Sequence, residues 1–167
     1  DLSTLPNGIY TRMSKVDLRV DWCSFEAAKY AVMNWHYSKT MPSGKLVKIG
    51  VWEHDKFVGV IIFGMGATPE IAKPFGLKQT QVCELVRVAL ANHQSPTSQS
   101  LAASIKLLKN QSPDLKMIVS FADSNQSHHG GIYQANNWFY VGISQDEYCL
   151  INGKTEHPRT VVARYGS

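Results

Sequence analysis

Apolar residues recur along the chain with two different periods, which mark out the expected secondary structure. Six segments show a period of about two residues or a short unbroken apolar run, and both patterns predict β-strands. The expected strands cover residues 18–22, 46–52, 57–63, 81–90, 117–122 and 138–143. Polar residues 53–56 join the second strand to the third, so these two form an antiparallel hairpin. A second hairpin is expected at Asn152-Gly153, with one further strand to close the sheet.

Helical spacing appears in two longer segments. Behind Ser24, a favourable N-cap, apolar residues three or four positions apart predict a helix to about Trp35. Ser95 and Pro96 open a second helix, because serine caps well and proline suits the first helical position, and Pro113 marks its end. The remaining segments are a short helix over residues 131–135 and loops over 38–44 and 64–80.

The alternation of strands and helices predicts an α/β (α+β) fold, in which helices flank one mixed, mostly antiparallel sheet. With 167 residues, 44% of them hydrophobic, the chain suffices for a single domain over residues 1–167. No apolar run approaches the roughly 20 residues that cross a bilayer, and the N-terminus lacks a signal-peptide pattern. A cytoplasmic location without a membrane partner is therefore expected.

The spacing of the cysteines and the net charge limit the kinds of site and partner that the chain can have. Cys23, Cys83 and Cys149 are widely separated and show no metal-binding spacing, so they are expected to be reduced, buried thiols. The net charge of +4 favours an anionic partner, and nucleic acid is the commonest one. The sequence contains no P-loop, dinucleotide-binding or zinc-finger motif.

Four places along the chain carry residues suited to chemistry, and the first two lie close together. Asp123 follows the apolar run 117–122, where a carboxylate can act as a base or a metal ligand, or can cap the following turn. His128 and His129 precede two glycines at the expected start of the short helix. That position suits an anion or, together with Asp123, a metal ion, and a solvated turn is the alternative.

The other two places are Arg87 and the end of the first helix. Strict alternation along the strand puts Arg87 on the same face as Leu85 and Ala89, opposite Glu84. There it forms a structural ion pair or holds a phosphate or carboxylate. Residues 35–39 combine Trp, His, Tyr and Lys. They suit proton transfer and stacking on a nucleobase, or else they supply the cations typical of a helix C-terminus.

The order of the elements resembles the GNAT acyltransferase fold. In that family the sheet splays between the fourth and fifth strands, which here are residues 81–90 and 117–122. A tyrosine in the helix after the fifth strand is the general acid of the family, and the resemblance puts Tyr133 in that position.

The helix after the fourth strand binds the pyrophosphate of coenzyme A in GNAT enzymes. The family's loop at this place carries glycines, whereas residues 95–102 of this chain carry none. Hydroxyl groups at the helix N-terminus can replace some of the contacts. The resemblance makes Ser98, Ser100 and Arg87 the candidate contacts to an acetyl-CoA donor.

A closer resemblance is to the Mom proteins of bacteriophages, a divergent GNAT-like family. The segments that carry it are NWHYSKTMPSGK, CELVRVAL, SFAD and HHGGIYQANNW, within residues 34–138. Mom proteins convert adenine in DNA to N6-carbamoylmethyladenine, which shields phage DNA from host restriction, and iron binding is attributed to them. The implied site comprises His36, Tyr37, Arg87, Ser98, Asp123 and Tyr133.

The resemblance implies double-stranded DNA as the substrate, in the cytoplasm of a bacterial host. Tyr37 and Trp35 are then the expected stacking surface for an extruded adenine. Lys39, Lys45 and Lys48 are the expected contacts to backbone phosphates. Family members continue past residue 166, so truncation at the C-terminus is expected, and the oligomeric state stays open, a homodimer included.

Two mechanisms remain open, because the product joins nitrogen to a methylene carbon and plain acetyl transfer would give an amide. In one, Asp123 is a base, Tyr133 is an acid, and the small donor is not a plain thioester. In the other, redox chemistry occurs at iron bound by His36, Tyr37 and Asp123. The alternatives to DNA modification are a conventional GNAT N-acetyltransferase acting on a protein or small molecule, and a non-catalytic DNA-binding module.

Overall fold

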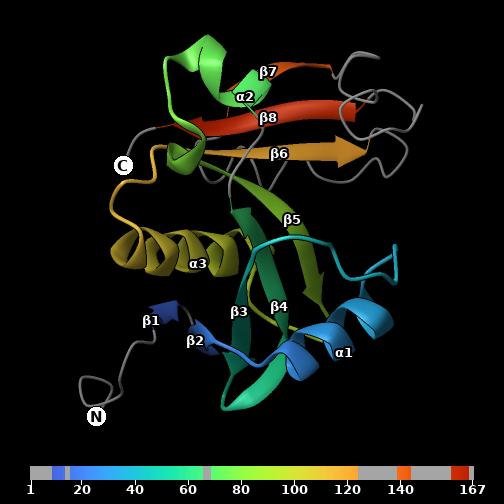
Figure 1. Cartoon of the computed structure of the whole chain (residues 1–167). Coiled ribbons are helices and arrows are strands. Elements are labelled where there is room, and N and C mark those ends of the chain that lie inside the picture. The colour runs from blue at the N-terminus through green and yellow to red at the C-terminus, as the bar shows by residue number, and fades with distance from the viewer. Residues whose placement is uncertain (1–8, 14–15, 66–68, 124–138, 144–158, 166–167) are drawn as a thin grey trace.

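A computed structural model gives the architecture (Figure 1), and it describes residues 9–13, 16–65, 69–123, 139–143 and 159–165. In this described part the strands form one sheet with the order β1-β2-β3-β4-β5-β6-β8-β7. Neighbours are antiparallel except β5 and β6, which are parallel. The strands are β1 (Ile9–Met13), β2 (Val16–Trp22), β3 (Leu46–Glu53), β4 (Lys56–Met65), β5 (Val82–Leu90), β6 (Met117–Asp123), β7 (Phe139–Ile143) and β8 (Arg159–Tyr165).

Two helices cover opposite faces of the sheet, α1 (Phe25–Trp35) and α3 (Thr97–Gln111). Leu101, Ile105 and Leu108 of α3 pack with one set of alternating strand residues, which includes Val51 and Ile61. Helix α1 packs on the other face, against the alternate strand residues, which include Val60 and Ile62. This three-layer arrangement is the predicted α/β fold, with both cores beside the middle strands.

Helix α1 forms as the sequence predicts. The Ser24 hydroxyl accepts a hydrogen bond from the Ala27 N–H at 3.1 Å, which satisfies one of the unpaired donors at the helix start. Ala28, Ala31 and Val32 are fully buried against β4 and β5. Because these side chains are small, the helix axis can approach the sheet closely.

The two central strands separate half-way along their length. β5 and β6 pair only from Val82↔Met117 to Leu85↔Ser120, although both strands continue beyond those residues. Figure 1 shows their arrowheads pointing apart. The predicted splay between residues 81–90 and 117–122 is therefore confirmed.

A β-bulge accompanies this separation. Ile62 of β4 pairs with Arg87 and the next residue, Phe63, pairs with Leu85, so Val86 is the extra residue on β5. A bulge bends its strand and increases the local twist. It therefore turns the outer half of β5 away from β6, at the point where their pairing stops.

The segment 64–80, expected to be a loop, contains short helical turns instead. α2 (Pro69–Ala72) leads into the 3₁₀ turns Lys73–Phe75 and Gln79–Gln81. Ala72 is buried against Val82, Met117 and Val119, and Phe75 and Leu77 pack beside it. These apolar contacts fix the segment over the paired halves of β5 and β6.

The two ends of the sheet differ from the expectation as well. Strand β1 at residues 9–13 was not predicted, and β8 inserts between β6 and β7 as the closing strand. The expected helix over 131–135 and the hairpin at residues 152–153 lie outside the described residues. No helix in the described ranges is long and apolar enough to cross a membrane.

The start of α3 corrects the predicted cap. The helix begins at Thr97, the N-cap position is Pro96, and Ser95 does not cap it. The Ser95 hydroxyl instead donates to the carboxylate of Glu53, which also accepts the N–H groups of Gln94 (2.7 Å) and Ser95 (2.8 Å). The Ser95 hydroxyl therefore bonds to the charged carboxylate at the end of β3 and does not cap α3.

Glu53 is thus a buried anion, 5% exposed, that fixes the connection between β5 and α3. Burial alone would raise the pKa of its carboxyl group. The hydrogen bonds from Ser95 and Gln94, together with nearby His93, outweigh burial, and the net effect lowers the pKa.

Glu53→Gln is expected to reduce the free energy of unfolding at neutral pH by about 2 kcal/mol, because an amide nitrogen would face the loop N–H groups. The stabilisation by Glu53 is present above the carboxyl pKa of the unfolded chain, about 4.3, and disappears as pH falls through the lowered folded pKa. Urea unfolding at several pH values measures this. The curves of the wild type and of the Glu53→Gln variant should converge in acid, and parallel curves would contradict the assignment.

Candidate functional site

The segment after α1 is tied to the outer half of β5 by one side chain. Arg87 donates from Nε to the Thr40 carbonyl oxygen at 3.1 Å and from Nη2 to the Thr40 hydroxyl at 3.5 Å. Its Nη1 donates to the Val86 carbonyl at 2.8 Å, which lies at the bulge. The guanidinium therefore connects the bulge to the segment that carries His36 and Tyr37.

Arg87 shares a face with Ala89, as strict alternation predicts, but not with Leu85. Leu85 belongs to the core under α3, whereas Ala89 belongs to the core under α1. Arg87 pairs with Ile62, which is also under α1. The prediction that Arg87 shares a face with Leu85 was wrong, because the extra residue at the bulge reverses the alternation.

The charge of Arg87 is close to two other polar groups. Burial lowers the pKa of its guanidinium, while Tyr37 and Glu84 act in the opposite direction. Glu84 is therefore close enough to interact with Arg87. Strict alternation had predicted that Glu84 would lie on the opposite face of the sheet. Three of the predicted site residues, His36, Tyr37 and Arg87, gather where β5 leaves β6.

The rings of His36 and Tyr37 contact each other just after α1. Their ring centroids are 4.4 Å apart and the planes are inclined by 30°. Tyr37 is 61% exposed and His36 is half-buried. His36 Nδ1 lies 2.8 Å from the Ser38 hydroxyl and accepts the Ser38 N–H at 3.1 Å. Ser38 is a contact that the sequence analysis did not single out.

Asp123 is the last residue of β6, the strand from which β5 diverges. Its backbone therefore stands at the carboxyl end of the strand, as predicted, and its side chain lies outside the described residues. Tyr133, His128 and His129 also lie outside them. Their roles stay predictions.

The candidate cofactor residues lie in the first two turns of α3. Ser98 is partly exposed, whereas Ser100 is 1% exposed. The Ser100 hydroxyl is a buried side-chain group without a hydrogen-bond partner in the described part of the chain. The N–H groups at a helix start lack partners within the helix and suit an anion.

Trp35 has packing partners that account for its position. Tyr30 meets its ring edge-on at 5.4 Å, and Phe57 lies 6.1 Å away. Phe57 in turn contacts Trp52, over which the Arg19 guanidinium sits at 4.1 Å. Trp35 thus belongs to a row of rings across the sheet, and Tyr37 is the more exposed of the two predicted stacking residues.

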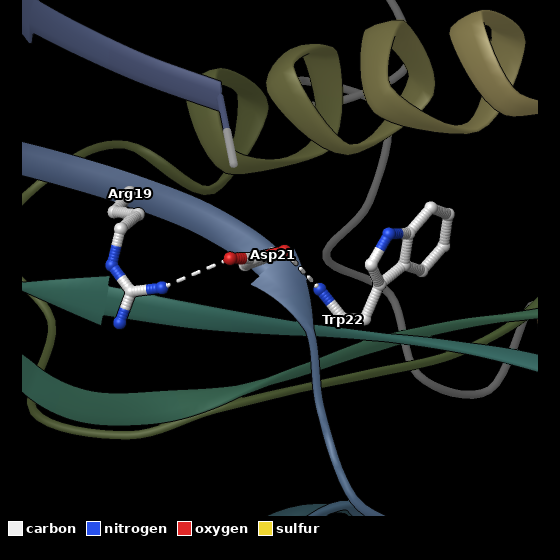
Figure 2. A network of polar contacts seen from close by, with 3 residues as sticks. All are labelled: Arg19, Asp21 and Trp22. Carbon is white, nitrogen blue, oxygen red and sulfur yellow. Dashed lines mark hydrogen bonds and ion pairs between the residues drawn. The ribbon is translucent and has the colours of Figure 1, made fainter. Parts of the chain in front are cut away.

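The Arg19 end of this row is held by β2 itself. Figure 2 shows the Arg19 guanidinium donating to one oxygen of Asp21 at 3.3 Å, while the other oxygen accepts the Trp22 N–H at 2.8 Å. The contacts keep Arg19 directed at Trp52. We infer a structural role for this pair, because it stabilises the aromatic row.

The three predicted phosphate-binding lysines are separated. Lys39 is exposed beyond α1, where its ammonium lies 3.5 Å from the Met33 carbonyl oxygen, as a cation at a helix C-terminus does. Lys45 is exposed directly before β3. Lys48 is half-buried near Cys23. Lys39 and Lys45 therefore flank the segment 40–44 that Arg87 holds.

Two thiols are neutral at physiological pH. Burial raises the pKa of Cys23 to about 11, against the opposing effect of Lys48, and raises that of Cys83 to about 12. Both are free cysteines. Cys83 is buried as expected, Cys23 is only partly buried, and Cys149 lies outside the described residues.

The sequence matches a known protein family and a curated relative. The model of the Mom protein family matches residues 17–167. The chain belongs to the Mom family. A curated member, the methylcarbamoylase mom of Escherichia phage Mu, is 26% identical over 151 residues, which are 88% of this chain and 63% of that relative. This Mom-family chain therefore spans less than two thirds of the length of the curated relative.

Several solved structures similar to the Mom-family chain are acetyltransferases. A GNAT-family acetyltransferase from Bacillus anthracis superposes with a TM-score of 0.61 at 13% identity, over 94% of this chain and 98% of its own. The aminoglycoside acetyltransferase AAC(6')-Ib, solved with coenzyme A and kanamycin, gives 0.63 at 10% identity, over 89% and 94%. The GNAT fold is thereby confirmed for this member of the Mom family.

Proposed function

We propose that this Mom-family chain is a transferase that converts adenine in DNA to N6-carbamoylmethyladenine and thereby protects the DNA from restriction enzymes. The observation that carries the proposal is its similarity, over 88% of its length, to a phage protein named methylcarbamoylase. The gathering of His36, Tyr37 and Arg87 at the splay of the sheet supports it.

The substrate must leave the double helix before it reacts. The N6 amine of adenine is paired within the duplex, so the base is extruded at a cost of a few kcal/mol. Tyr37 offers a largely exposed ring on which a purine can stack. The guanidinium of Arg87, beside Tyr37, suits an anionic group of the DNA or of the donor.

The reaction exchanges one bond for another. A bond forms between N6 and the methylene carbon of the acetamide group, and the bond from that carbon to the leaving group of the donor breaks. Asp123 accepts the proton of N6, and Tyr133 protonates the leaving group. The donor class is therefore an acetamide equivalent activated at its methylene carbon. Iron bound by His36, Tyr37 and Asp123 would instead supply redox chemistry.

The start of α3 offers a partial fit to the pyrophosphate of coenzyme A. Ser98, the Ser100 hydroxyl, which has no partner among the described residues, and the helix N-terminus would hold it. The N–H groups of Gln94 and Ser95 are already bound to Glu53, so fewer donors remain for a ligand. A calorimetric titration with acetyl-CoA separates a conventional acetyltransferase, which binds it tightly, from the proposed enzyme.

Mass spectrometry of nucleosides tests the proposal. DNA from cells that express the protein should contain deoxyadenosine that carries a carbamoylmethyl group on N6. Asp123→Ala should abolish the product, whereas the matched control Asp114→Ala, at an exposed carboxylate beyond α3, should leave it intact. Circular dichroism verifies that both variants fold. Unmodified DNA from wild-type cells, or DNA that is bound but not altered, would contradict the proposed activity.

A further inference from the structure

The segment 36–40 folds back so that its own polar groups surround one nitrogen of His36. The Ser38 N–H points at His36 Nδ1 over 3.1 Å. A backbone N–H can only donate, so Nδ1 must be the acceptor in this contact. A proton on Nδ1 would face the amide proton directly, and the arrangement disfavours it.

The Ser38 hydroxyl adds a second contact on the same side. It lies 2.8 Å from Nδ1 and 3.4 Å from the Thr40 carbonyl oxygen, and it accepts the Thr40 N–H at 3.3 Å. Because Thr40 N–H occupies the hydroxyl as an acceptor, its proton is directed to the nearer acceptor, Nδ1. Two donors from Ser38 therefore converge on one imidazole nitrogen.

A neutral imidazole has one accepting and one donating nitrogen. We propose that Ser38 is a positioning residue that holds His36 with its proton on Nε2, so that His36 acts as a hydrogen-bond donor and not as a metal ligand. The choice of adenine as the group that His36 contacts rests on the proposed function. Adenine presents a ring-nitrogen acceptor beside its exocyclic amine, and an Nε2–H group matches that acceptor.

The same contacts disagree with iron at His36. A ligating histidine gives the lone pair of one nitrogen to the metal and donates the N–H of the other to a neighbour. Here Nδ1 accepts from Ser38, and Nε2 carries the proton.

Nitrogen-15 NMR of the full-length protein labelled at histidine tests the tautomer without any need for activity. At about pH 8, where imidazole is neutral, Nδ1 of His36 should resonate in the unprotonated range and Nε2 in the protonated range. His36→Gln identifies the signals. Added Zn²⁺, a diamagnetic metal probe, should leave both unchanged. A proton on Nδ1, or a Zn²⁺-induced shift of either nitrogen, would overturn the proposal.

A pair of variants tests the role of the hydroxyl. Ser38→Ala keeps the N–H but loses one donor, so it should increase exchange between tautomers and lower kcat for DNA modification roughly tenfold, with KM for DNA unchanged. Ser38→Thr keeps the hydroxyl and should restore both readouts. Equal kcat in all three proteins would refute the positioning role. Wild-type protein that fails to modify DNA but shows the Nε2–H signal would refute only the proposed function.

Discussion

Arg87→Met is expected to lower DNA modification by at least about 100-fold while the protein stays folded. Methionine approximates the length of arginine but cannot donate to the carbonyl oxygens of Val86 and Thr40. The segment with His36 and Tyr37 would then lose its tie to β5, and the charge beside Tyr37 would disappear. Because the site is partly open to solvent, water can satisfy the released carbonyl groups, and the loss of stability should stay near 1 kcal/mol.

Two further variants separate charge from geometry in this experiment. Arg87→Lys keeps the charge, but one ammonium cannot reach both carbonyl oxygens in the way a planar guanidinium does, so an intermediate activity is expected. Lys106→Met removes one positive charge from an exposed position on α3 and should have no effect. Quantified nucleosides give the activities, and thermal unfolding gives the stabilities. Full activity in Arg87→Met would limit Arg87 to a structural role.

The sequence predicts those parts of the fold whose signals are local. Ser24 and the small inner residues of α1 lie within one stretch of chain, so the cap, the length and the buried face of this helix could all be anticipated. The same holds for the β3–β4 hairpin, in which a polar turn separates two β-rich runs. The splay of β5 and β6 followed from the resemblance to a known fold.

Features that depend on two distant segments could not be predicted in this way. The bulge at Val86 exists only in the pairing of β5 with β4, and it puts Arg87 and Leu85 on different faces. Ser95 looked like a cap, but its partner Glu53 lies 42 residues earlier in the chain. Strand β1 is short and becomes recognisable only by its pairing with β2.

The residues of the candidate site also differ in whether a local sequence signal could reveal them. His36, Tyr37 and Arg87 were predicted, and the structure brings them together. Ser38 was missed, although a serine two residues after a histidine at a helix end is a local signal, since serine commonly bonds to neighbouring groups in turns. Thr40 gave no such signal, because its carbonyl matters only once β5 lies beside it.

Gly59→Ala is expected to destabilise the protein by about 4 kcal/mol or more. Gly59 has a φ of +147°, a region that side chains rarely adopt. A Cβ at this position would overlap the Ala89 carbonyl oxygen and approach Leu90 Cα to 2.8 Å. These obstacles are backbone atoms, so no rotamer change can relieve them, and β4 would have to move away from β5.

Moving β4 away from β5 would also affect function, because the outer half of β5 pairs with β4 and no longer pairs with β6. Urea unfolding measures the loss of stability, and nucleoside analysis should show lost modification. Gly76→Ala is the matched control, since Gly76 also has a positive φ (+68°) but open space around its Cβ position, and it should cost about 1 kcal/mol. Equal effects at the two glycines would mean that φ, and not the close approach of β4 to β5, sets the requirement for glycine at position 59.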